Sequence, residues 1–197
     1  MDNKNIKRAI LVDTAALSEA AFDIIVNFER MLNRRIPDVD IKRWLYAAAC
    51  DGKFVVSDEE VYAVLLKEKA KHSYRNLNFN GIVIGEESRF SCGDFNFRVD
   101  FAEYEGSSDH AFMETLEKLM TELPGLEEIV CVPGEDICQY AARILSEHRR
   151  LRATVLSMES LRGGGFGHEY LSCSISYALG VTDREIESNG TPVEDEM

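Results

Sequence analysis

Apolar positions recur along the chain with two different periods, which predicts buried strands mixed with amphipathic helices. A short apolar run over residues 8–12 ends at an aspartate and is typical of a buried strand. Apolar side chains follow at helical spacing over residues 14–35. The same spacing returns over residues 38–52, where Asp38 or Asp40 is suited to cap the helix. We therefore expect one strand followed by two helices.

The pattern changes twice in the middle of the chain. Residues 57–73 begin with Ser57-x-x-Glu60, which is the pattern of a helix capping box, so we expect a third helix there. Residues 81–104 are rich in aromatic and β-branched side chains, and Gly93–Asp94 suits a hairpin turn. Apolar and polar residues alternate after that turn, as in a strand with one buried face. This stretch predicts a β-meander.

The last third alternates between strand and helix. The segments in order are a helix at 107–123, a strand at 128–132, a helix at 135–147, a strand at 152–158, a glycine-rich loop and a helix at 168–180. Such alternation implies βαβ crossovers and a parallel sheet. We expect a three-layer α/β fold, with a mostly parallel sheet and helices on both faces. Residues 1–181 would form a single domain, and the acidic residues 182–197 would form a disordered tail.

Composition limits the surroundings and the partners of this domain. The chain has 197 residues, 45% of them hydrophobic, and no apolar run of membrane-spanning length. The N-terminus lacks the apolar region of a signal peptide, and the five cysteines are scattered without a CxxC pair. These features predict a cytoplasmic protein with free thiols and no membrane partner.

The net charge of −13 disfavours RNA as a partner unless basic residues gather on one face. Two groups of basic residues could do so. They are Arg30, Arg34, Arg35, Lys42 and Arg43, and then Arg143, His148, Arg149, Arg150 and Arg152. Solvated helix faces are the simpler interpretation of both groups.

Several acids follow the predicted strands. They are Asp13, Asp100, Glu135 and Asp136, with Asp109 at the start of the helix after the meander. In an open parallel sheet the carboxyl ends of the strands share one edge, where ligands bind. Carboxylates that meet there repel one another, and Mg²⁺ or Mn²⁺ relieves that repulsion. The alternative is that each acid only caps a helix or favours its dipole.

Three stretches resemble NYN domains, a PIN-like family. They are "RAILVDTAAL", "FRVDFAEYEGSSDHAFMETLEKLM" and "EEIVCVPGEDICQYAARILSEHRRLRATVLSM", which together cover roughly half of the chain. The resemblance implies a Rossmann-like sheet, a carboxylate cluster that binds Mg²⁺ or Mn²⁺, and ribonuclease activity. It assigns catalysis to Asp13, Asp100 and Asp136. Those three and Glu135 would bind the metal, with Asp109 in support.

The chain also departs from the pattern of that family. The family loop reads Gly-Asp-Ser-Asp-Phe, whereas this chain reads "PGEDICQ", and "TAAL" follows Asp13. A catalytically inactive PIN-like module for binding or assembly, including a homo-oligomer, is therefore the alternative function.

The glycine-rich loop "LRGGGFGHEYL" is a second candidate site. Ahead of a helix, the backbone N–H groups of Gly163, Gly164 and Gly165 could bind an anion, with charge added by Arg162 and His168. No Walker A or Gly-x-Gly-x-x-Gly pattern is present, so a nucleotide-binding module is only a third option. A flexible loop is the simpler interpretation.

Overall fold

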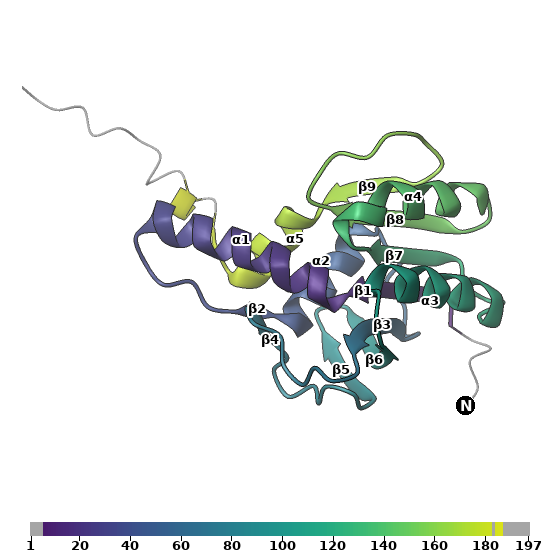
Figure 1. Ribbon diagram of the computed structural model, residues 1–197, viewed down its shortest axis with the longest axis horizontal. Helices are drawn as coiled ribbons and strands as arrows, with labels where there is room; N and C mark the ends of the chain where they lie inside the picture. The colour runs from purple at the N-terminus through teal and green to yellow at the C-terminus, as the bar shows by residue number, and fades with distance from the viewer. Residues whose placement is uncertain (1–5, 183, 187–197) are drawn as a thin grey trace, which may run out of the picture.

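A computed structural model describes residues 6–182 and 184–186, and in that part of the chain one large sheet organises the fold (Figure 1). Its strands are β1 (Arg8–Asp13), β3 (Val61–Glu68), β5 (Ser88–Cys92), β6 (Phe95–Tyr104), β7 (Glu128–Val132), β8 (Arg152–Ser157) and β9 (Gly167–Tyr170). The helices are α1 (Thr14–Leu32), α2 (Ile41–Asp51), α3 (Ser108–Glu122), the short 3₁₀ helix η2 (Glu135–Ile137), α4 (Cys138–Glu147) and α5 (Leu171–Leu179). A separate small pair consists of β2 (Val39–Asp40) and β4 (Leu77–Asn78).

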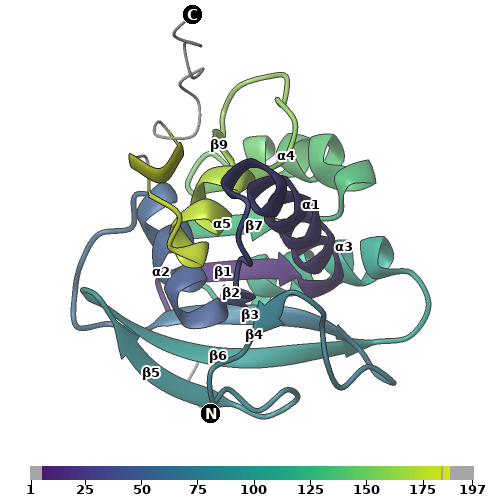
Figure 2. The ribbon, with the colours of Figure 1, turned by 90° about the vertical axis from the view of Figure 1, so that its left-hand side faces the viewer.

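The seven strands of the large sheet lie in the order β5-β6-β3-β1-β7-β8-β9. Neighbours are parallel throughout, except that β5 pairs with β6 in antiparallel fashion. Figure 2 shows β1 between β3 and β7, with β5 and β6 toward one edge of the sheet. The prediction of an α/β fold with a mostly parallel sheet is therefore confirmed, as is the hairpin that adds an antiparallel edge strand.

Helices cover both faces of the sheet and make two cores. On one face Ile10 and Val12 of β1 pack with apolar residues of α1, α2 and α5. On the other face Ala9 and Leu11 of β1 pack with residues of α3 and α4. This alternation along a strand buried on both faces explains why residues 8–12 read as a continuous apolar run. Figure 1 shows the two sets of helices on opposite sides of the sheet.

The helix predicted over residues 57–73 is wrong, because this segment contains the central strand β3. Val61 to Leu66 are apolar or aromatic without a break, as expected of a strand buried between two layers of helices. Ser57 does not cap a helix; its hydroxyl oxygen accepts a hydrogen bond from the guanidinium of Arg8 at 2.6 Å. The predicted helix at 168–180 is also shorter, because residues up to Tyr170 form the edge strand β9.

The prediction of a disordered tail falls mainly on residues 183 and 187–197, which lie outside the described residues. None of the helices in the described ranges has the length and apolar character needed to cross a membrane.

Asp51, the last residue of α2, is expected to make stability depend on pH. Its Oδ2 is buried and has no hydrogen-bond partner among the described residues, and burial, followed by the charge of Glu169, raises its pKa to about 6. A carboxyl whose pKa is raised on folding stabilises the protein below its unfolded pKa, and this stability is lost as the pH rises toward 6. Asp51→Asn should therefore stabilise the fold by about 1–2 kcal/mol at pH 8 and by little at pH 4. Urea unfolding at both pH values measures this difference, and an equal gain from Asp58→Asn, an exposed control, would contradict it.

Candidate carboxylate site at the switch point of the sheet

The connections that leave β1 and β7 diverge, although these two strands are neighbours. From β1 the chain proceeds to β3 on one side, and from β7 it proceeds to β8 on the other side. Divergence of this kind opens a crevice at the carboxyl ends of the two strands, where open α/β sheets bind ligands. The residues at that point are Asp13, which ends β1, and residues 133–136, which follow β7.

Asp13 is fixed at this crevice by its role in capping α1. The residue is only 2% exposed, and its Oδ1 accepts hydrogen bonds from the backbone N–H groups of Ala15 at 2.9 Å and Ala16 at 3.2 Å. This bonding confirms the capping interpretation. It engages one carboxylate oxygen and leaves Oδ2 to face the residues that follow β7.

Gly134 marks the point where two carboxylates approach each other. A Cβ atom on Gly134 would lie 2.8 Å from Oδ1 of Asp109 and 3.7 Å from Oδ2 of Asp13. Its backbone angles, φ −58° and ψ 151°, suit any residue, so the only obstacle to a side chain here is the Asp109 carboxylate, which would have to shift to admit a Cβ atom. Asp109 reaches this point because Ser107 caps α3, which places Asp109 in the first turn of the helix.

Asp136 adds a third negative charge to this region. The pKa of the Asp109 carboxyl is raised by burial and, after that, by the charges of Asp13 and Asp136. Asp136 lies in the short helix η2 and its side chain is exposed. We call Asp13, Asp109 and Asp136 the carboxylate site. These acids come from three separate connections, after β1, β6 and β7.

Glu135 faces a different space from its neighbour Asp136. It lines a cavity of about 290 Å³ together with Glu19 and Asp23 of α1. Cys138 lines the same cavity and is buried, and burial, with the charges of Glu135 and Asp109, raises the pKa of its thiol to about 12. A thiol of this kind stays protonated near neutral pH, which argues against nucleophilic catalysis by Cys138.

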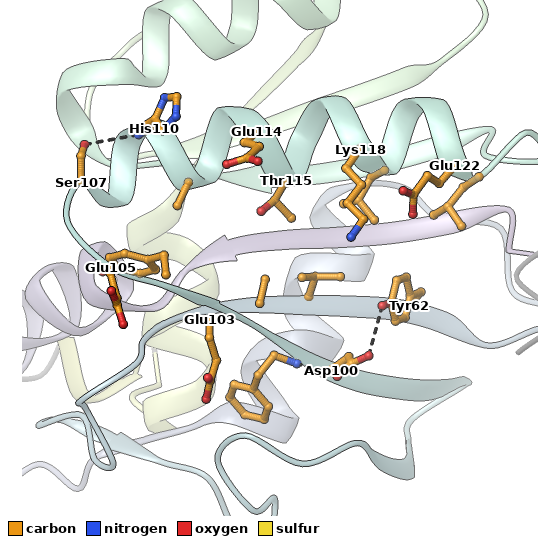
Figure 3. A pocket seen from close by; sticks show the side chains of 17 residues that line it. Tyr62, Asp100, Glu103, Glu105, Ser107, His110, Glu114, Thr115, Lys118 and Glu122 are labelled. Carbon is orange, nitrogen blue, oxygen red and sulfur yellow. Dashed lines mark hydrogen bonds between the residues drawn. The ribbon is translucent and has the colours of Figure 1, made fainter.

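Asp100 does not lie at the end of its strand, so that expectation is wrong. Strand β6 continues to Tyr104, and Asp100 pairs in register with Val64 in the middle of β3. Figure 3 shows Asp100 and Tyr62 on the strands below α3. Both residues line a groove of about 620 Å³ between these strands and α3. The Tyr62 hydroxyl donates to Oδ2 of Asp100 at 3.4 Å, a long hydrogen bond.

The sheet register gives the separation between Asp100 and Asp13. Asp13 pairs with Leu66, and Leu66 pairs with Ala102, so Asp100 lies two residues earlier and two strands away. Ordinary strand spacings make that a Cα separation of roughly 12 Å. The fold therefore brings Asp109, rather than Asp100, close to Asp13.

The carboxylate site has the charge expected of a cation site. Within residues 6–182 and 184–186, none of its three carboxylates forms an ion pair with lysine, arginine or histidine. Thr14, next to Asp13, has a buried hydroxyl without a hydrogen-bond partner in the same residues. Over that part of the chain, however, no group of three or more His, Cys, Asp or Glu side chains is placed to hold a metal ion. A site would thus require rotation of at least one side chain, and the exposed Asp136 has the room for it.

The glycine-rich loop is not the helix N-terminus that the sequence suggests. It leads into strand β9, and α5 begins only at Leu171. The Nε2 atom of His168 lies 2.9 Å from Oγ of Ser157. The predicted mode of anion binding, by backbone N–H groups at the start of a helix, is therefore wrong for this loop.

Sequence reasoning overlooked two residues near Asp13. Gly134 lies in the loop "PGEDICQ", but the approach of two acids that are far apart in the sequence leaves no local signal at that glycine. Tyr104, at the end of β6, has a pKa raised by burial and then by the charge of Asp13. The alternation of apolar residues in the meander predicts that Tyr104 is a strand residue, but not that it lies near another strand's end.

Charge repulsion in the carboxylate site predicts the effect of Asp109→Asn. In EDTA this substitution should raise Tm by up to about 3 °C at pH 7, because it removes a charge that its neighbours disfavour. The gain should shrink as the pH falls, since the wild-type carboxyl then takes up a proton. Thermal unfolding of Glu117→Gln, an exposed charge on the same helix, is the matched control. A destabilised Asp109→Asn would contradict the interpretation.

Comparison with known proteins gives one match. A family model described as a family of unknown function (DUF6621) matches residues 3–186. No curated protein and no solved structure matches the chain.

Proposed function

The chain belongs to the DUF6621 family, and we propose that it is a phosphodiesterase that acts on RNA with Mg²⁺ or Mn²⁺ held at the carboxylate site. The observation that carries this proposal is the approach of Asp13 and Asp109 to each other around Gly134, with the charge of Asp136 nearby. The proposal retains the ribonuclease activity that the resemblance to NYN and PIN-like domains implies. It assigns to Asp109 the metal-binding role that the resemblance gave to Asp100.

Two further features support a cation at this point. The site lies at the switch point of an open α/β sheet, and its acids lack basic partners in the described residues. Several carboxylates without a counterion raise the free energy of the fold, and functional sites often carry such a cost.

Each acid has a separate part in the proposed chemistry. Asp13 offers a fixed oxygen, because its other oxygen caps α1. Asp109 offers a second oxygen from α3, and the exposed Asp136 turns inward to complete the set. Oxygen donors of this type suit Mg²⁺ and Mn²⁺, which activate water and offset negative charge on a phosphoryl group when bound.

Metal-dependent cleavage tests the proposed activity. Wild-type protein should cleave a labelled single-stranded RNA in Mn²⁺ and leave it intact in EDTA, and adding back Mn²⁺ should restore cleavage. Equal cleavage in EDTA would indicate a contaminating or metal-independent nuclease. If the protein cleaved RNA neither in Mn²⁺ nor in Mg²⁺, the proposed activity would be contradicted.

The second candidate function is a binding or assembly module that has the fold without the chemistry. The side-chain positions favour it, since no group of three His, Cys, Asp or Glu side chains in residues 6–182 and 184–186 is placed to hold a metal ion. A protein that neither binds Mn²⁺ nor cleaves RNA, but forms a stable dimer by light scattering, would support this function instead.

A further inference from the structure

A groove of about 530 Å³ begins at the carboxylate site and follows α4. Asp136 lines one end of it, and the walls carry the aromatic rings of Tyr140 and Phe166 and the side chains of Arg143 and Arg162. Among the residues that the structure describes, Asp136 is the only acid in this lining. Within a chain of net charge −13, the groove combines two arginines with two aromatic rings.

Helical spacing sets the order of groups along one wall. Tyr140 and Arg143 are three residues apart on α4, which places them on one face of that helix, and Asp136 precedes them in η2. The guanidinium of Arg143 lies 5.1 Å from the centre of the Tyr140 ring, so the two side chains lie together. Both are exposed. Basic residues 148–150 follow directly after the end of α4.

The opposite wall is tied to α4 by Gln139. Its side-chain amide donates to the backbone oxygen of Arg162 at 2.8 Å, and its Oε1 accepts from the backbone N–H of Arg162 at 2.9 Å. Gly165 has a positive φ of 88°, and a Cβ there would lie 3.2 Å from Cβ of Ser146. These contacts hold the glycine-rich loop against α4 and fix the backbone of Arg162 beside the groove.

We propose that Arg143 and Arg162 form a phosphate-binding subsite next to the carboxylate site, with Gln139 as the residue that positions Arg162. The ligand is a phosphate group of a single-stranded polynucleotide, because the exposed ring of Tyr140 and the half-buried ring of Phe166, in one groove with two arginines, suit unstacked bases joined by phosphates. The choice of substrate in this inference rests on the proposed function. In place of the predicted anion binding by backbone N–H groups of the loop, the anion is bound by arginine side chains.

Binding in EDTA tests the subsite without the metal or the chemistry. Fluorescence anisotropy of a fluorescein-labelled oligouridylate of about ten nucleotides should show binding by wild type at low salt. Arg143→Gln and Arg162→Gln should each weaken it by about threefold to tenfold, and the double variant should also lower the slope of affinity against salt concentration. Gln139→Leu should weaken binding at unchanged net charge. Tyr140→Leu should weaken it at least fivefold for the single strand and not for a duplex.

The double variant Arg34→Gln/Arg35→Gln is the matched control, since it removes the same charge beyond the end of α1. An equal loss in the control would overturn the proposal, as would a wild-type protein that does not bind the oligonucleotide. The two proposals fail separately. If binding depends on both arginines but no metal-dependent cleavage occurs, the phosphate subsite is supported and the phosphodiesterase activity is contradicted. If cleavage occurs but binding does not depend on Arg143 and Arg162, the activity is supported and the subsite is contradicted.

Discussion

Asp13→Asn is expected to lower Mn²⁺-dependent RNA cleavage at least about 100-fold, or roughly 2.7 kcal/mol of transition-state stabilisation. The substitution removes the charge of Asp13 and leaves an amide oxygen that can still accept from Ala15 and Ala16. Asparagine caps helices as well as aspartate does, so the loss should be chemical rather than structural. Initial cleavage rates at saturating Mn²⁺, with far-UV circular dichroism of both proteins, measure the two effects together.

Asp40→Asn is the matched control for this variant. Asp40 caps α2 through Lys42 and Arg43, as Asp13 caps α1, and it is not one of the acids that approach Gly134. We expect its cleavage rate to stay within about twofold of wild type. If both variants lost cleavage equally, Asp13 would matter as a cap and not as a ligand.

Arg8→Met is expected to destabilise the fold by about 3 kcal/mol. The Arg8 side chain is buried on β1, and its guanidinium donates to the backbone oxygens of Val55 and Glu59 and to the hydroxyl of Ser57. These bonds tie the connection between α2 and β3 to the first strand. Methionine fills a similar volume but leaves all three oxygens without their donor. The free energy of unfolding in urea measures the cost.

Lys7→Met separates that network from simple charge pairing. Lys7 forms an exposed ion pair with Glu59 at 2.9 Å, and pairs of this kind contribute less than about 1 kcal/mol. We therefore expect a small effect from Lys7→Met. Comparable losses in the two variants would show that the buried bonds of Arg8 contribute no more than a surface pair.

Local sequence patterns predicted most of the helices and strands. The prediction was wrong where one apolar pattern fits both a helix and a buried strand. The caps at Asp13, Asp40 and Ser107 are local, since each acts on N–H groups two or three residues away. The segment at β3 has apolar residues that satisfy both a helical and a buried-strand template. Its true partners lie on β1 and β6, so only the assembled sheet decides between the two.

The candidate site was predictable to the extent that it depends on strand ends. Asp13 and Asp136 follow apolar runs whose length is readable, and the fold brings both into the field of Asp109. The prediction that Asp100 ends its strand was wrong, because β6 continues past it to Tyr104. The length of β6 is set by its pairing with β3. The meeting of Asp13 with Asp109 around Gly134 depends on where α3 crosses, and the sequence does not encode that distance locally.

Direct titration with Mn²⁺ tests the central claim that the carboxylate site binds a divalent cation. Isothermal titration calorimetry of wild-type protein at pH 7.5 should give about one site per chain, with Asp13→Asn and Asp109→Asn each weakening it at least tenfold and Asp100→Asn leaving it unchanged. Affinity should fall as the pH is lowered, because protons compete for the raised-pKa carboxyl of Asp109. Absence of binding, or binding lost in Asp100→Asn and kept in Asp109→Asn, would contradict the account.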